Sequence, residues 1–130
     1  MRLIITLALI SLLSGCSLTP PKFDNNEYYI VARIDAISKL MHDECGNRQR
    51  VEQYIEQLKL ESQTLSTYTF YLPHHTDLFE ISKILVEDVD ELSAKYQQNK
   101  EPSLEYCKLK TQSISLKVRR TLQTIGNLGE

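Results

Sequence analysis

The chain has 130 residues, of which 17 are acidic and 15 basic, so its formal net charge is −2. Acidic and basic residues are interspersed along it. This distribution excludes the basic stripe of a nucleic-acid-binding domain and the polybasic patch that holds proteins on anionic lipid. Once a short N-terminal segment is set aside, roughly 115 residues remain, enough for one domain with a single core and too few for two.

Residues 1–15 are typical of a lipoprotein signal peptide. The segment has one positive charge and an apolar run that is too short to span a bilayer and that ends in small residues. Leu13-Ser14-Gly15-Cys16 resembles a bacterial lipobox, and the resemblance implies cleavage before Cys16 and a covalent lipid on it; no other cofactor is expected. The alternative is an ordinary secretory signal with a chance cysteine.

The residues after the cleavage point predict an anchor and a tether. One acyl chain gives only marginal membrane binding, and the several chains of a triacylated cysteine would hold the protein durably. Ser17 rather than aspartate follows the cysteine, which by resemblance to Gram-negative lipoprotein sorting implies the periplasmic face of the outer membrane. Residues 16–26 form the predicted tether, stiffened by Pro20-Pro21, and residues 27–130 the folded domain.

The cysteine count agrees with export. A lipid on Cys16 leaves Cys45 and Cys107, which an oxidising compartment would pair as a disulfide. Closing a loop of about 60 residues stabilises a fold by about 4 kcal/mol in the chain-entropy model. The alternative is two free, buried thiols. Two cysteines make a poor metal site, and with no histidine at ligand spacing from them no metal is expected.

Apolar residues at helical spacing predict four helices. The first covers residues 27–44 and carries the stripe Ile30, Ile34, Ile37 and Met41. The second begins at Asn47, a natural N-cap, and must end before Pro73. Residues 67–71 are β-branched or aromatic and would favour a strand in isolation, which leaves the last turns of this helix open.

The two remaining helices have their own start signals. The third is expected to start at Thr76 or Asp77, where Asp77 and Glu80 stand at capping-box spacing, and Ile84 lies beside its stripe. After a polar turn at 97–101, Pro102 is expected to open the fourth, whose stripe begins at Leu104. Together they predict an all-α fold, an antiparallel up-down four-helix bundle stapled by one disulfide.

No set of residues predicts catalysis. His74 and His75 lie in the turn after Pro73, where adjacent histidines are solvated far more often than they bind a metal. An acidic run on the third helix (Glu87, Asp88, Asp90 and Glu91) is expected to be a solvated face. No serine or cysteine nucleophile has a base partner, and no glycine-rich phosphate loop is present. We therefore expect a binding protein and not an enzyme.

A surplus of apolar side chains suggests where a partner binds. One inward stripe per helix cannot accommodate all of Tyr28, Tyr29, Leu60, Phe70, Tyr71, Phe79 and Val86. Scattered surface aromatics are normal in soluble domains, which is the plain interpretation of any one of them. Several on neighbouring helices could instead line a groove for an amphipathic helix of a partner protein.

The overall layout resembles the type II secretion pilotins of the PulS/OutS kind. The matching residues are Leu13-Ser14-Gly15-Cys16, the stretch 40–48 around Cys45, and the run from Tyr96 through Pro102 to Cys107. The resemblance implies a four-helix outer-membrane lipoprotein. It also implies capture of the disordered C-terminal segment of a secretin, which folds as a helix in a hydrophobic groove and is carried to the outer membrane.

Two other roles suit a small, stapled, membrane-tethered domain. One is an immunity, exclusion or lysis-related lipoprotein of the envelope. The other is a structural accessory subunit of an envelope complex. The sequence alone leaves these alternatives open beside the pilotin role, because architecture of this kind serves many functions.

Overall fold

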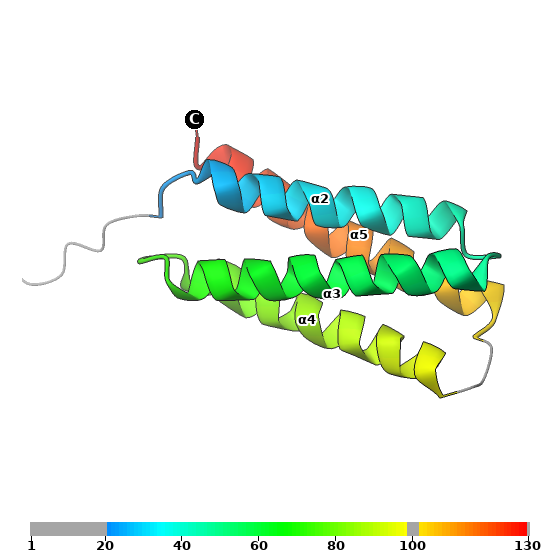
Figure 1. Ribbon diagram of the computed structural model, residues 1–130. Coiled ribbons are helices and arrows are strands. Elements are labelled where there is room, and N and C mark those ends of the chain that lie inside the picture. The colour runs from blue at the N-terminus through cyan, green and yellow to red at the C-terminus, as the bar shows by residue number, and fades with distance from the viewer. Residues whose placement is uncertain (1–20, 99–101, 130) are drawn as a thin grey trace, which may run out of the picture.

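A computed structural model describes residues 21–98 and 102–129, and within them the chain forms four α-helices and no strand (Figure 1). The helices are α2 (Asn25–Asp43), α3 (Arg48–Phe70), α4 (Thr76–Gln97) and α5 (Leu104–Asn127). The predicted all-helical class is confirmed. The predicted signal peptide, the predicted lipidation site Cys16, residues 16–20 of the predicted tether and positions 99–101 of the polar turn lie outside the described residues.

Side-chain caps fix where α2 and α3 begin. The Asp24 carboxylate accepts a hydrogen bond from the backbone N–H of Glu27 at 2.9 Å, so α2 starts two residues earlier than predicted. Asn47 caps α3 as predicted, accepting from the backbone N–H of Arg50 at 3.2 Å. The tether is correspondingly shorter than the sequence suggested.

α4 starts at Thr76, one of the two predicted positions, but the capping of α4 and α5 differs from the prediction. Ser103 caps α5 by accepting from the backbone N–H of Tyr106 at 3.1 Å, so Pro102 precedes the helix instead of opening it. The N-cap of α4 is His75, whose side chain makes no capping bond. The predicted capping box beginning at Asp77 is therefore wrong.

The ambiguous end of the second helix is helical. α3 continues to Phe70, through the β-branched and aromatic residues that would favour a strand in isolation. Thr69 is buried there, and its hydroxyl donates to the carbonyl of Leu65 at 2.9 Å within the same helix. Packing against neighbouring helices outweighs the local strand propensity.

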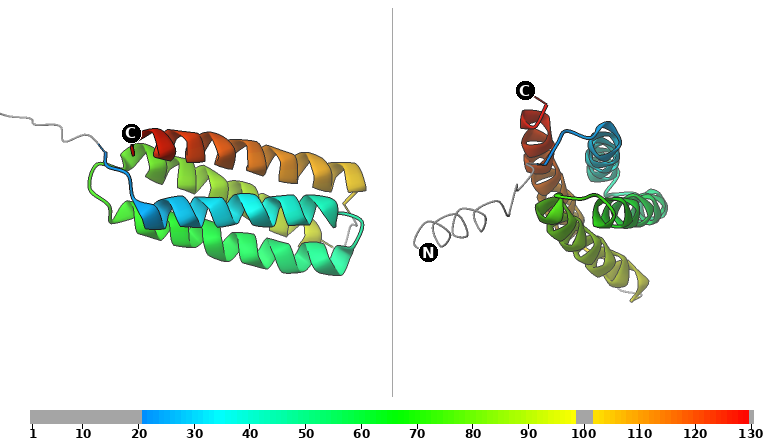
Figure 2. Two further views of the ribbon diagram at one scale, coloured as in Figure 1. Left: turned by 90° about the horizontal axis from the view of Figure 1, so that it is seen from above. Right: turned by 90° about the vertical axis from the view of Figure 1, so that its left-hand side faces the viewer.

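The helices pack side by side in a defined order. α3 lies along α2 on one side and α4 on the other, and α2 also lies along α5, whereas α4 and α5 approach each other least. The end of α2, the start of α3, the end of α4 and the start of α5 lie together at one end of the molecule (Figure 1). The start of α2, the α3–α4 connection and the C-terminus lie at the other end (Figure 2).

The core draws on every helix. Its largest fully buried apolar side chains are Ile34, Met41, Leu58, Leu65, Leu85, Leu92, Ile114 and Ile125. Each such side chain contributes about 1.5–3 kcal/mol through removal of apolar surface from water. Three residues assigned to or beside the predicted stripes are exposed instead: Leu40 at 52%, Leu104 at 51% and Ile84 at 48%.

Small hydroxyl residues fill the core between the helices. Ser38, Ser62, Thr111 and Thr121 are buried, and each donates to a backbone carbonyl three or four residues earlier in its own helix. The hydroxyls of Ser38, Ser62 and Thr121 are thereby satisfied within their own helices, and that of Thr111 also lies 3.0 Å from a ring nitrogen of His42 on α2. The small side chains leave room for the helix backbones to approach.

The predicted disulfide between Cys45 and Cys107 is present. Cys45 lies just after α2 and Cys107 in the first turn of α5, and their Cα atoms are 5.7 Å apart. Both residues are buried. The bridge joins α2 to α5 at the end of the molecule opposite the start of α2.

Reduction of this bridge should lower the free energy of unfolding by about 4 kcal/mol, because the cross-link closes a loop of 62 residues in the unfolded chain. Urea unfolding followed by far-UV circular dichroism, with and without reductant, measures the change. The double variant Cys45→Ser, Cys107→Ser is the control, since reductant should leave its midpoint unchanged. A wild-type midpoint insensitive to reductant would contradict the prediction.

Candidate functional site

Three of the predicted partner-binding residues meet where α3 passes into α4. The ring of Phe70 lies edge-on to that of Tyr71, with centroids 5.0 Å apart, and 5.4 Å from that of Phe79. Phe70 is 61% exposed and Tyr71 76%, whereas Phe79 is half-buried. These rings therefore pack mainly on one another and leave large apolar faces in solvent.

A second aromatic group lies at the start of α2. Tyr28 and Tyr29 were both predicted to bind a partner, and their ring centroids are 6.4 Å apart. Phe23, which the sequence did not single out, joins them with its ring 6.0 Å from that of Tyr28. Tyr29 is 64% exposed.

One polar contact joins the elements that carry the two aromatic groups. The Tyr68 hydroxyl lies 3.0 and 3.1 Å from the two oxygens of the Asp24 carboxylate and donates to it. It also accepts from the side-chain amide of Asn26 at 3.2 Å. The start of α2 is thus held against the end of α3. The residues in contact are more than 40 positions apart in the sequence, so no local pattern indicates the contact.

An apolar hollow of about 520 Å³ lies on the outer side of α3. Leu60, Thr64, Thr67 and Tyr71 line it at spacings of four, three and four residues, which puts them on one helix face, and Tyr68 and Leu72 flank them. Leu60 and Tyr71, both predicted to bind a partner, are brought together here. Val86 does not line the hollow, because it lies half-buried on α4, two turns beyond Phe79.

A buried acid–imidazole pair lies beneath the aromatic groups. The prediction that the adjacent histidines are solvated is wrong for His75, which is 7% exposed and whose Nδ1 lies 3.0 Å from a carboxylate oxygen of Glu27. Glu27 is fully buried, and its loss of hydration raises the pKa of its carboxyl above the ordinary 4.5 despite the opposing attraction of His75. Nothing local in the sequence indicates this pair, whose members are 48 residues apart.

The backbone adjusts to bring His75 inward. His74, its neighbour, has a φ of 68°, in the left-handed region that residues with a Cβ seldom adopt. The turn after Pro73 therefore directs the second histidine, and not the first, into the core.

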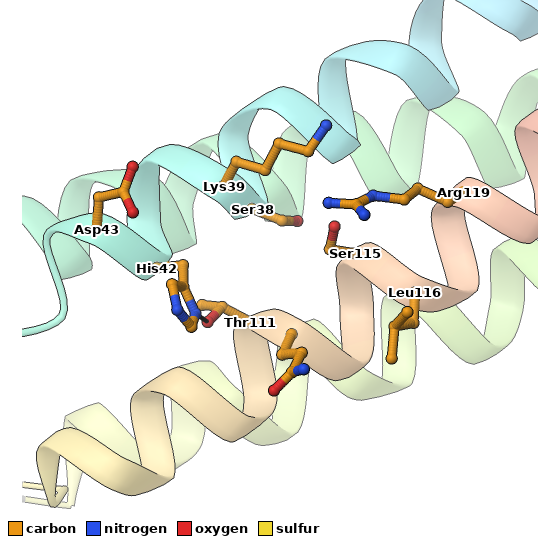
Figure 3. A pocket seen from close by; sticks show the side chains of 9 residues that line it. Ser38, Lys39, His42, Asp43, Thr111, Ser115, Leu116 and Arg119 are labelled. Atoms are coloured by element: carbon orange, nitrogen blue, oxygen red, sulfur yellow. Dashed lines mark hydrogen bonds between the residues drawn. The ribbon is translucent and has the colours of Figure 1, made fainter.

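A polar cleft of about 430 Å³ lies between α2 and α5 (Figure 3). Three of its lining residues contact Asp35, which accepts from the Ser115 hydroxyl at 2.7 Å and pairs with Lys39 and Arg119. Burial alone would raise the pKa of Asp35, but the hydrogen bonds from Lys39 and Ser115 and the two cations outweigh it and lower the pKa. The carboxylate on α2 binds Ser115 and Arg119 on α5, so this cluster ties the two helices together.

The wall of the same cleft holds a histidine beside a hydroxyl. His42 Nδ1 lies 3.0 Å from Thr111 Oγ1 (Figure 3). Thr111 is fully buried, and its hydroxyl donates to the backbone carbonyl of Cys107 at 2.9 Å. Because Thr111 lies on α5 and His42 on α2, the contact joins the two helices.

Part of the acidic run on α4 is paired and not simply solvated. Asp88 binds Lys117, and Glu91 binds Lys110 at 2.6 Å, both across to α5. The hydrogen bond from Lys110 lowers the pKa of the Glu91 carboxyl. Across the two described ranges, no group of three or more His, Cys, Asp or Glu side chains could hold a metal ion, and no helix is both long and apolar enough to cross a bilayer.

Comparisons with protein-family models, curated proteins and solved structures yield no match. The exposed apolar side chains at the α2 start, along the outer side of α3 and at the α3–α4 connection are the surface features that remain to be explained. These exposed side chains are therefore the candidate binding surface.

The free energy of unfolding of Glu27→Gln should rise relative to that of the wild type as the pH increases. Because the folded-state pKa of Glu27 is raised, the wild type loses stability when the pH climbs from 4.5 through that higher pKa, and glutamine does not titrate. Each pH unit between the two pKa values adds about 1.4 kcal/mol to the difference. Urea unfolding from pH 4 to pH 8 measures it.

The matched control is Glu56→Gln, which removes an acid from the exposed side of α3. Its difference from the wild type should not follow the same pH course. A Glu27→Gln difference that is constant with pH would show that burial does not raise the pKa of this carboxyl.

Proposed function

We propose that this protein is a lipoprotein of the outer membrane, facing the periplasm, that binds another protein and has no catalytic role of its own. More specifically, we propose a pilotin, which takes up the C-terminal segment of a secretin and carries it to the outer membrane for assembly. The lipobox-like sequence before Cys16 and the disulfide support an exported, anchored protein.

The observation that carries the binding role is the apolar hollow on α3. Leu60 is 65% exposed and Tyr71 is 76% exposed, at opposite ends of one helix face. Large apolar side chains gathered in this way expose surface that gains free energy when a partner covers it. A partner with an apolar stripe of its own is the natural complement.

The dimensions of the hollow suit a helix. Leu60 and Tyr71 are separated by 11 positions, or about 16 Å along α3 at the helical rise. A partner helix of three turns, with apolar residues at i, i+3 or i+4, and i+7, would match this length. A disordered C-terminal segment that folds on binding would offset its ordering cost by burying that stripe.

We infer an up-down antiparallel order for the four helices. Residues 44–47 connect α2 to α3, and residues 71–75 connect α3 to α4. Connections this short join only neighbouring helix ends and favour antiparallel neighbours. In this order the tether leaves the molecule at the end opposite the disulfide, and the hollow faces sideways, clear of the cross-linked end.

Leu60→Asp should weaken binding of a synthetic peptide that contains the C-terminal segment of the secretin from the same genome by at least about tenfold, because a charge would enter the apolar contact. Isothermal titration calorimetry measures the affinity, and circular dichroism reports helix formation by the peptide. Leu109→Asp is the matched control, since Leu109 is a leucine of similar exposure, 59% against 65%, on α5.

Equal weakening by the two substitutions would count against the hollow as the binding site. Failure of the wild type to bind the peptide, together with correct secretin assembly in cells lacking the protein, would overturn the pilotin proposal. Sensitivity of those same cells to a neighbour's toxin would favour the immunity role instead.

A further inference from the structure

The exposed aromatic side chains of the described residues all lie at one end of the bundle. They are Phe23, Tyr28, Tyr29, Phe70 and Tyr71, which we call the aromatic end. The segment before α2 and the α3–α4 connection, which carry or adjoin them, lie at the same end (Figure 2). The other exposed large apolar residues in the described ranges are leucines and one isoleucine, spread over the four helices.

The opposite end lacks this character. Tyr96 and Tyr106, the tyrosines beside the α4–α5 connection, are buried and half-buried respectively. Lys95 lies over the ring of Tyr106, 5.7 Å from its centroid, and Arg48 donates to the backbone carbonyl of Tyr96 at 3.1 Å. Exposed aromatic rings are therefore concentrated at the aromatic end, and the tyrosines at the other end are covered.

The aromatic end is also where the chain leads to Cys16. Phe23 is held in place by Tyr28 and by the C-terminal turn, where a Cβ added to Gly129 would lie 3.4 Å from its ring. Seven positions separate Phe23 from Cys16, and a fully extended chain of that length spans at most about 25 Å. A lipid on Cys16 would keep the aromatic end within this distance of the bilayer surface.

The chemistry of the aromatic end suits the interface of a bilayer. Rings with an apolar face and a polar edge or hydroxyl concentrate at the headgroup level of membranes. Lys22 and Asp24 put one charge of each sign beside the rings, so nothing there demands anionic lipid. Affinity would come from apolar burial and would depend little on salt.

We propose that the aromatic end lies in the membrane interface, with the bundle pointing away from the bilayer and the disulfide end outermost. The proposal rests on the lipid anchor proposed above, and goes beyond it because the domain, and not only the lipid, would contact the membrane. The hollow on α3 would remain open along the side, with Tyr71 at the boundary between the two surfaces.

The chain contains no tryptophan, so one introduced residue reports its own surroundings. The lipidated protein carrying Tyr29→Trp is reconstituted in phosphatidylethanolamine vesicles whose acyl chains are brominated near the headgroup. Its emission should fall about twofold or more relative to unbrominated vesicles, since a ring at the interface lies within reach of the bromine atoms. Leu109→Trp, near the disulfide end, is the control and should not be quenched.

Tyr71→Trp provides a second reporter from the other aromatic group, in case Tyr29→Trp fails to fold. Quenching equal to that of Leu109→Trp in both reporters would overturn the proposal. A reporter that is not quenched, and whose emission shifts to the blue only when the secretin peptide is added, would also overturn the proposal. The aromatic end would then bind protein and not lipid.

Flotation of the wild-type protein with vesicles tests the anchor separately. If the protein does not float, the proposed lipidation is wrong, and the same reporters are measured with the chain attached through Cys16 to a maleimide-bearing lipid. Quenching in that arrangement would support membrane contact by the aromatic end even without natural lipidation, and its absence would refute it.

Discussion

The cross-link between Cys45 and Cys107 is the constraint on which the arrangement of the helices depends. It joins the end of the first described helix to the start of the last, so the chain between them, α3 and α4 included, is one closed loop. α2 also packs along α5 and shares the Asp35 cluster with it. The pair formed by α2 and α5 is therefore fixed both covalently and by polar contacts, and α3 and α4 pack against it.

The remaining contact, between α4 and α5, is of another kind. These helices approach each other least, and long charged side chains span the gap through the pairs of Lys117 with Asp88 and Lys110 with Glu91. Exposed ion pairs of this kind contribute little stability individually. The bundle is thus bound tightly on three sides and loosely on the fourth, whereas its exposed apolar surface lies elsewhere, on α3 and at the aromatic end.

Helical periodicity predicted most of the fold, because burying one stripe of a helix requires apolar residues every three or four positions. The disulfide followed from counting cysteines. Local patterns failed where distant residues decide. His75 is buried because it pairs with Glu27, 48 positions away, and residues 67–70 are helical because Thr69 packs in the core. Of the seven surplus apolar residues, Tyr28, Tyr29, Leu60, Phe70 and Tyr71 are exposed, whereas Phe79 and Val86 are half-buried. The sequence pattern could not show that these residues divide between the aromatic end and the hollow on α3, because that division depends on how the helices pack.

The small hydroxyl residues of the core have a mechanical consequence. Ser38, Ser62 and Thr121 donate within their own helices, whereas Thr111 also contacts His42 of α2, so few of these core hydroxyls fix the register of one helix against the next. Asp35 with Ser115 is a clear exception, and it acts between α2 and α5, the pair already cross-linked. α3 is tied to its neighbours by Glu61 with Arg33 of α2, by Lys59 with Asp90 of α4, and by Thr69 with Ser82. The covalent spine of the bundle is therefore the pair α2 and α5, and the helix that carries the hollow is held against it by packing and by contacts that salt can weaken.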